Sequence, residues 1–200
     1  APTDAIVRIE NAVYEARLEG TDLVEGLATL QIQHDVSHPV ELPLELCGIP
    51  IFHPRWKFEP SIPATVGFTQ QQICAAVVER SGALQFDWSV RGTKDSLEVV
   101  NFPLRFPASP SSRLILDLPV QRIPVIDHGQ VAGPFESQYV QDTTRRTPQQ
   151  SPGGHAPAKW NRWHLALGGH SHVELRVLPE VVFQQRERLV LLREATKYDL

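Results

Sequence analysis

Apolar and polar residues alternate along most of this chain, and an alternation with a period of two is typical of half-buried β-strands. The clearest case is residues 83–90, where each second residue is apolar. Similar alternation covers parts of 13–34, 97–118 and 163–177. No stretch shows the longer period of an extended amphipathic helix. The pattern therefore predicts an all-β fold with roughly eight to eleven strands.

Turn residues separate these strands at intervals of about 8–12 residues, as in β-sandwiches and small barrels. Because each strand has one apolar and one polar face, the sheets are expected to be antiparallel. We therefore expect an antiparallel β-sandwich or flattened barrel, for which a jelly-roll arrangement is one possibility. Three hairpins are predicted, joining 13–18 to 23–34, 83–90 to 97–106, and 163–167 to 173–177. The inward positions predict a core of Leu30, Ile32, Leu84, Phe86, Trp88, Phe102, Leu104, Leu116, Trp163, Leu165, Val173 and Leu175.

Two segments depart from the regular alternation. In the predicted strand 23–34, Gly26 lies on the same face as Val24 and Ala28, and a glycine inside a strand often marks a bulge or a close backbone approach. Residues 127–159 are rich in Gly, Pro and Gln and have few apolar positions. That composition predicts one long flexible loop within a single β-rich domain of residues 1–200.

Charge excludes some classes of partner. The formal net charge is -4, the pI is about 6.1, and no block of like charges occurs. This distribution gives no electrostatic footprint for nucleic acid, which is therefore not an expected partner. No apolar run approaches the ~18 residues that a membrane-spanning helix needs, so no membrane span is expected in this chain.

One histidine-rich segment suggests metal chemistry. His170, His172 and Glu174 occupy alternate positions and would share one face of a regular strand. In the predicted hairpin, His164 lies opposite Glu174, so His164, His172 and Glu174 could converge. Imidazole and carboxylate groups are suitable ligands for zinc, iron or manganese. The alternative is a solvated strand face, which Arg176 continues.

The pattern of two histidines and a carboxylate in 170–174 loosely resembles the first motif of the cupins, which are β-barrel proteins. The resemblance implies a metal-dependent β-barrel enzyme that uses His164, His172 and Glu174. Glu174 follows the second histidine more closely than in that motif, and we do not assign the chain to the family.

Tryptophan and cysteine residues provide further candidates. Trp56 and Trp160 are surrounded by polar residues and are expected to be exposed, as in a carbohydrate-binding module. The two cysteines, Cys47 and Cys74, permit one disulfide in an exported protein. Their alternative is two buried free thiols, because an unpaired cysteine behaves as a small core residue.

The chain contains no nucleophile–base set, no phosphate-binding loop and no dinucleotide fingerprint. We therefore expect a non-catalytic interaction or structural module without a cofactor, with a protein or a glycan as partner. The chain begins at Ala1 without methionine, as a mature exported protein would. The expected location is extracytoplasmic (periplasmic, cell-surface or secreted), in a bacterial protein of which this chain could be one part.

Overall fold

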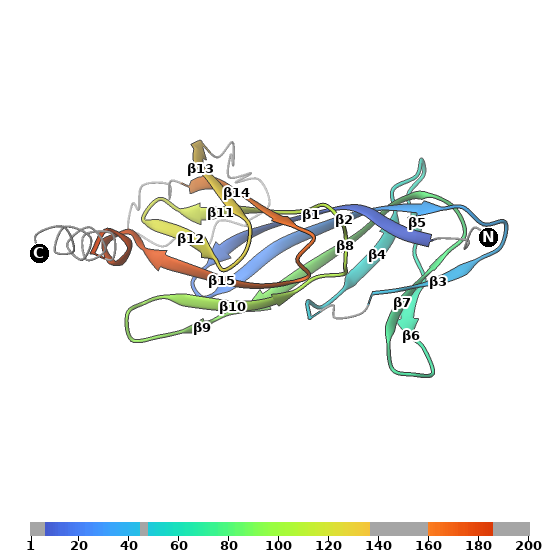
Figure 1. The fold of residues 1–200 in the computed structure, drawn as a ribbon, viewed down its shortest axis with the longest axis horizontal. Helices are drawn as coiled ribbons and strands as arrows, with labels where there is room; N and C mark the ends of the chain where they lie inside the picture. The colour runs from blue at the N-terminus through green and yellow to red at the C-terminus, as the bar shows by residue number, and fades with distance from the viewer. Residues whose placement is uncertain (1–6, 45–47, 137–159, 186–200) are drawn as a thin grey trace, which may run out of the picture.

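The computed structural model describes residues 7–44, 48–136 and 160–185, whose regular secondary structure is nearly all β-strand. The largest sheet has eight strands in the order β13–β14–β11–β1–β2–β8–β4–β5. Their bounds, in that order, are Gln130–Glu136, Trp160–Gly168, Ser112–Pro119, Val7–Glu19, Asp22–His34, Gly82–Arg91, Phe52–Trp56 and Ile62–Pro63. The central strands β11, β1, β2 and β8 lie side by side roughly along the long axis of the molecule (Figure 1).

Two smaller sheets accompany the large one (Figure 1). The four-stranded sheet has the order β12–β15–β10–β9, with bounds Arg122–Ile126, His172–Pro179, Val100–Arg105 and Thr93–Lys94. The three-stranded sheet has the order β3–β7–β6, with bounds Val40–Pro43, Cys74–Val78 and Val66–Phe68. The predicted all-β, sandwich-like fold is confirmed. The described residues form 15 strands, however, which is more than the sequence predicted.

Among the described strands, pairing is antiparallel with one exception. β1 and β11 run parallel, with a register from Ala12↔Ser112 to Arg17↔Asp117. The other neighbours of these strands, β2 and β14, pair with them in the antiparallel sense. An alternating sequence pattern indicates which side chains face inward. It does not indicate whether two neighbouring strands run parallel or antiparallel.

The predicted core is confirmed, because all the core residues named from the sequence are buried. Inward side chains of the eight-stranded sheet pack against those of β10 and β15. Phe106, directly after β10, stacks on Tyr14 of β1 at a centroid distance of 4.1 Å. It also meets the edge of Trp88 of β8 at 6.5 Å, so this one side chain connects the two sheets.

Gly26 lies at a β-bulge, as its position in the sequence suggested. The register between β2 and β8 shifts between Leu23 and Gly26, and Glu25 has a φ of 52°. The shift places Leu23 in the core and leaves Val24 only half-buried, so the inward orientation predicted for Val24 is wrong. A Cβ atom at Gly26 would come within 2.6 Å of the Trp88 ring, so the close approach of the two strands requires glycine here.

The predicted hairpin of 13–18 with 23–34 is confirmed, because β1 and β2 pair across the turn at Glu19–Asp22. The other two predicted hairpins are wrong. β8 pairs with β2 and β4, whereas β10 pairs with β15 and β9. β14 pairs with β11 and β13, whereas β15 pairs with β10 and β12. In each case the chain crosses from one sheet to the other instead of returning beside itself. Two strands that face each other across a core have the same alternation as two strands of one hairpin.

The segment predicted as a flexible loop, 127–159, is partly a strand. Residues Gln130–Glu136 form β13, which pairs with β14 along the edge of the large sheet. All seven residues of β13 are exposed. A strand that buries neither face needs no alternation of apolar and polar residues, so the sequence pattern did not predict it. Residues 137–159 lie outside the described residues. Among those that are described, no helix is long and apolar enough to span a membrane.

Candidate functional site

His164 does not meet the other predicted metal ligands. It lies on β14 in the large sheet, in register with Ala132 and Ile115, and its ring contacts the Phe135 ring edge-on at 5.1 Å. His172 and Glu174 lie on β15 in the other sheet, in register with Arg105 and Pro103. The convergence expected from the hairpin is therefore wrong, because the hairpin does not form.

The other three predicted ligands gather around two residues that the sequence pattern did not indicate. The His170 ring stacks on that of His128, with centroids 4.8 Å apart and planes 17° apart. His172 Nε2 lies 3.2 Å from Glu174 Oε1, and the Glu174 backbone N–H donates to Asp127 Oδ1 at 3.0 Å. We refer to Asp127, His128, His170, His172 and Glu174 as the histidine cluster.

Only the fold brings the histidine cluster together. Asp127 and His128 follow β12, and the remaining members follow β14 or lie on β15, about 40 residues later in the chain. Burial alone would raise the pKa of Asp127, but backbone hydrogen bonds and the neighbouring His128 hold it below its usual value. Among the described residues, no three His, Cys, Asp or Glu side chains are already placed to hold a metal ion.

The two candidate tryptophans differ in their exposure and in their ring contacts. Trp56 lies on β4, is 8% exposed and stacks on Phe58 at a centroid distance of 6.0 Å. The expectation that Trp56 is exposed is therefore wrong, and this ring offers no platform to a sugar. Trp160 opens β14 and is half-buried, with the Arg17 guanidinium 5.4 Å from its ring centroid.

The disulfide between Cys47 and Cys74 stays a prediction, because Cys47 lies outside the described residues. Cys74 is half-buried at the start of β7, and burial raises the pKa of its thiol. The Cys74 carbonyl oxygen accepts a hydrogen bond from the Leu44 backbone N–H at 2.7 Å. Cys47 comes three residues after Leu44 in the chain.

A polar group on the outer face of the large sheet includes a strained histidine. His53 has a φ of 47° and lies at a register shift between β4 and β8. Its Nδ1 is 3.0 Å from Asp87 Oδ2, and both terminal nitrogens of Arg55 lie 3.0 Å from Asp87 Oδ1. Burial by itself would raise the pKa of Asp87, but the hydrogen bonds from His53 and Arg55 and the Arg55 charge lower it.

Asp87 is expected to contribute to stability only above acidic pH. A carboxyl whose pKa is lower in the folded state stabilises the fold above its unfolded pKa, about 3.9, and loses this effect as the pH falls through the folded value. The free energy of unfolding of Asp87→Asn should therefore decrease less steeply than that of the wild type as the pH falls below about 4. Urea denaturation at a series of pH values measures this. Glu41→Gln is the control, and an equal flattening in both variants would contradict the assignment to Asp87.

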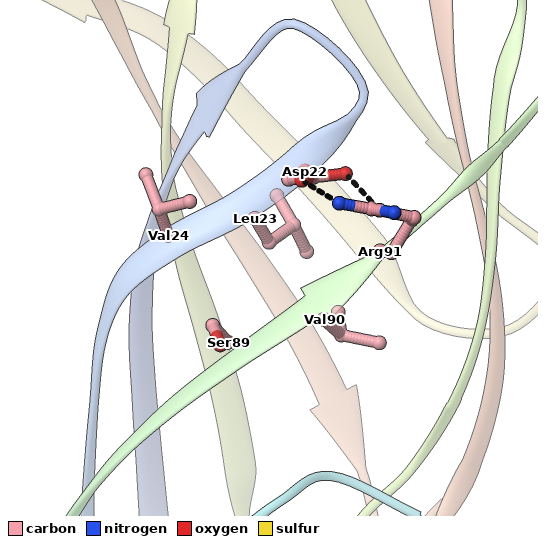
Figure 2. A pocket seen from close by; sticks show the side chains of 6 residues that line it. All are labelled: Asp22, Leu23, Val24, Ser89, Val90 and Arg91. Atoms are coloured by element: carbon pink, nitrogen blue, oxygen red, sulfur yellow. Dashed lines mark hydrogen bonds and ion pairs between the residues drawn. The ribbon is translucent and has the colours of Figure 1, made fainter.

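The hollows on the surface of the described residues include two that are open to solvent. One, of about 340 Å³, lies where the bulge in β2 meets the end of β8. Figure 2 shows Leu23, Val24, Ser89 and Val90 around it, with Asp22 and Arg91 paired above. The other, of about 540 Å³, lies between the start of β1, the end of β3 and residues 108–110. The charged groups of the first hollow, Asp22 and Arg91, pair with each other.

Three exposed apolar side chains mark one end of the molecule. Leu97 is 54% exposed in the β9–β10 turn, Val120 is 42% exposed in the β11–β12 turn, and Val181 is 66% exposed in the helical turn after β15. These three connections lie at the same end, on the left of Figure 1. We call Leu97, Val120 and Val181 the end patch.

Hydrogen bonds hold the three connections of the end patch together. Arg122, after the β11–β12 turn, donates to the Glu98 carbonyl oxygen at 2.6 Å. The Glu180 backbone N–H donates to the Gln121 carbonyl oxygen at 2.9 Å. Asp95 Oδ1 accepts from the backbone N–H of Leu97 at 2.8 Å and fixes the β9–β10 turn.

Comparison with known proteins shows likeness of fold. No family model and no curated protein sequence matches this chain. An M1 zinc metallopeptidase from Deinococcus radiodurans is 10% identical, with a TM-score of 0.49 over 86% of this chain. A mutant two-domain M1 zinc metallopeptidase bound to L-tryptophan is also 10% identical, with a TM-score of 0.50 over 88% of this chain. This chain spans 42% and 43% of the length of those two chains. At this identity the likeness concerns the fold alone.

Proposed function

We propose that this chain is a non-catalytic interaction or structural module of an exported bacterial protein, of the cell envelope or extracellular, and that it binds a protein partner through the end patch. The observation that carries the proposal is the gathering of Leu97, Val120 and Val181 on three connections that hydrogen bonds hold together. Exposed apolar side chains that cluster on loops at one end of a scaffold are typical of an interaction surface.

The surroundings of the end patch suit protein recognition. The apolar side chains are flanked by Lys94, Glu98 and Arg122, and Lys94 forms an ion pair with Glu98. An apolar centre with a charged rim is the usual anatomy of a protein interface. The Asp95 hydrogen bonds to the backbone N–H groups of Leu97 and Val99 order the turn before binding, which lowers the entropic cost of association.

The fold comparison supports a role beside another domain. In the two-domain metallopeptidase, the matched region is 43% of that chain, so a fold of this kind occurs there within a longer polypeptide. We propose that the present fold likewise acts together with another domain or chain. The peptidase activity named for that protein is not part of the proposal.

In-cell photo-crosslinking tests the partner surface. A photoreactive amino acid placed at position 97, 120 or 181 of the full-length gene product should yield covalent adducts with the same partner at all three positions. Leu97→Asp and Val120→Asp should each reduce the adduct formed from position 181, because a charge in an apolar contact must be desolvated. Mass spectrometry of the adducts identifies the partner.

Position 68 provides the matched control. Phe68 is 75% exposed on β6, in a different sheet from the end patch, and a probe there should not capture the same partner. Equal capture from position 68, or no adduct from any end-patch position, would contradict the proposal. Cell fractionation tests the exported location separately, and a cytosolic full-length product would contradict that part.

A further inference from the structure

Two connections that cross between the sheets carry the histidine cluster. Residues 127–129 lead from β12 to β13, and residues 169–171 lead from β14 to β15. β12 neighbours β15 in the four-stranded sheet, and β13 neighbours β14 in the eight-stranded sheet. Both connections therefore cross the same side of the sandwich, and they bring histidines from distant parts of the sequence together.

The backbone that carries His128 is fixed on both sides. Before it, the Asp127 side chain accepts the Glu174 backbone N–H and so attaches the connection to β15. After it, Gly129 has a φ of 109°, and a Cβ atom at this position would lie 2.2 Å from the Ala166 carbonyl oxygen. Only glycine allows this approach to β14. The backbone of His128 therefore has a defined position at the crossing between the two sheets.

The chemistry of the cluster suits a transition-metal ion. Three imidazoles with two carboxylates favour zinc, nickel or copper over magnesium or calcium, which prefer sites made only of oxygen ligands. Arg105 and Arg176 lie on the same outer strand face as His172 and Glu174. The charges of Asp127 and Glu174 offset those of the two arginines. The Glu174 carboxylate already contacts His172 Nε2, as a supporting carboxylate does for a ligating histidine.

We propose that His128, His170 and His172 together bind one divalent transition-metal ion of the zinc, nickel and copper class, with Asp127 and Glu174 as supporting carboxylates. In the structure the rings of His128 and His170 stack on each other, and no three His, Cys, Asp or Glu side chains of the described residues are grouped to hold a metal ion, so binding requires some of these rings to turn. The side chains of His128 and His172 are 57% and 54% exposed, so both rings can change rotamer freely. Metal binding replaces the ring stack with ligation. This site is independent of the end patch.

Isothermal titration of untagged, chelator-treated protein with Zn²⁺ and with Ni²⁺ tests the site. One ion per chain should bind, and His128→Ala, His170→Ala and His172→Ala should each weaken binding at least about tenfold. Titration with Mg²⁺ or Ca²⁺ should give no binding. Thermal unfolding of each variant without metal should match the wild type, because the three side chains are exposed.

His164→Ala is the matched control. His164 lies on β14 in the large sheet, outside the cluster, and its removal should leave the affinity unchanged. Electron paramagnetic resonance of the Cu²⁺ complex should show coupling to imidazole nitrogens that His128→Ala reduces. Absence of binding by the wild type, wild-type affinity in His128→Ala, or an equal loss in His164→Ala would overturn the proposal.

Discussion

Replacing Gly26 with alanine is expected to lower the free energy of unfolding by about 3 kcal/mol, a typical cost of overpacking a core. The added Cβ would lie 2.4 Å from the Trp88 carbonyl oxygen and 2.6 Å from its ring. The carbonyl belongs to the backbone of β8, which pairs with β2 at this point, so the clash cannot be relieved by a side-chain rotation alone. Urea denaturation followed by tryptophan fluorescence measures the change.

Gly67→Ala is the matched control for Gly26→Ala. Gly67 lies on β6, has no atom within 4 Å of an added Cβ, and should tolerate alanine within about 0.5 kcal/mol. Trp88→Leu removes the ring but keeps the carbonyl oxygen. Because the two positions share a contact, the double variant Gly26→Ala/Trp88→Leu should be less destabilised than the sum of the single variants. An additive result, or a stable Gly26→Ala protein, would contradict the packing argument.

Replacing Phe106 with alanine is expected to cost about 4 kcal/mol, in the range for large buried aromatic residues. Phe106 is fully buried between the sheets and contacts the rings of Tyr14 and Trp88. Its removal leaves a cavity between the two layers, and stabilities of ~5–15 kcal/mol are usual for a domain, so the loss is a large fraction of the total.

Thermal and urea denaturation measure the Phe106→Ala effect, and near-ultraviolet circular dichroism reports whether Trp88 loses its fixed environment. Phe68→Ala removes the same side chain from a position that is 75% exposed, and it should change stability by less than about 0.5 kcal/mol. Similar losses in the two variants would show that Phe106 does not connect the two sheets.

Some residues of the candidate sites could be predicted from the sequence, and others could not. His170, His172 and Glu174 could be selected from their spacing, because alternate residues share a strand face. His128 and Asp127 could not, because they lie in a segment without apolar periodicity and meet the others only through the crossing of two connections. The end patch gave no signal either, since its three members are single apolar residues in three separate turns.

The sequence by itself determined the secondary-structure class and the identity of the core. The period-two alternation of strands such as β8, β10 and β15 shows which side chains are buried in the core. The burial of these apolar side chains is the main contribution to the stability of the fold. Gly26 was also recognisable, because a glycine on the buried face of a strand often marks a bulge or a close backbone approach.

Only the tertiary structure decided which strands pair. Trp163 and Leu175 face the core from different sheets, although their alternation fits one hairpin equally well. The physical reason is that burial depends on the face of a strand, whereas pairing depends on backbone hydrogen bonds, which are the same for every residue type except proline. The parallel pair β1–β11, the exposed strand β13 and the histidine cluster all follow from that pairing, so none of them is encoded in the apolar pattern.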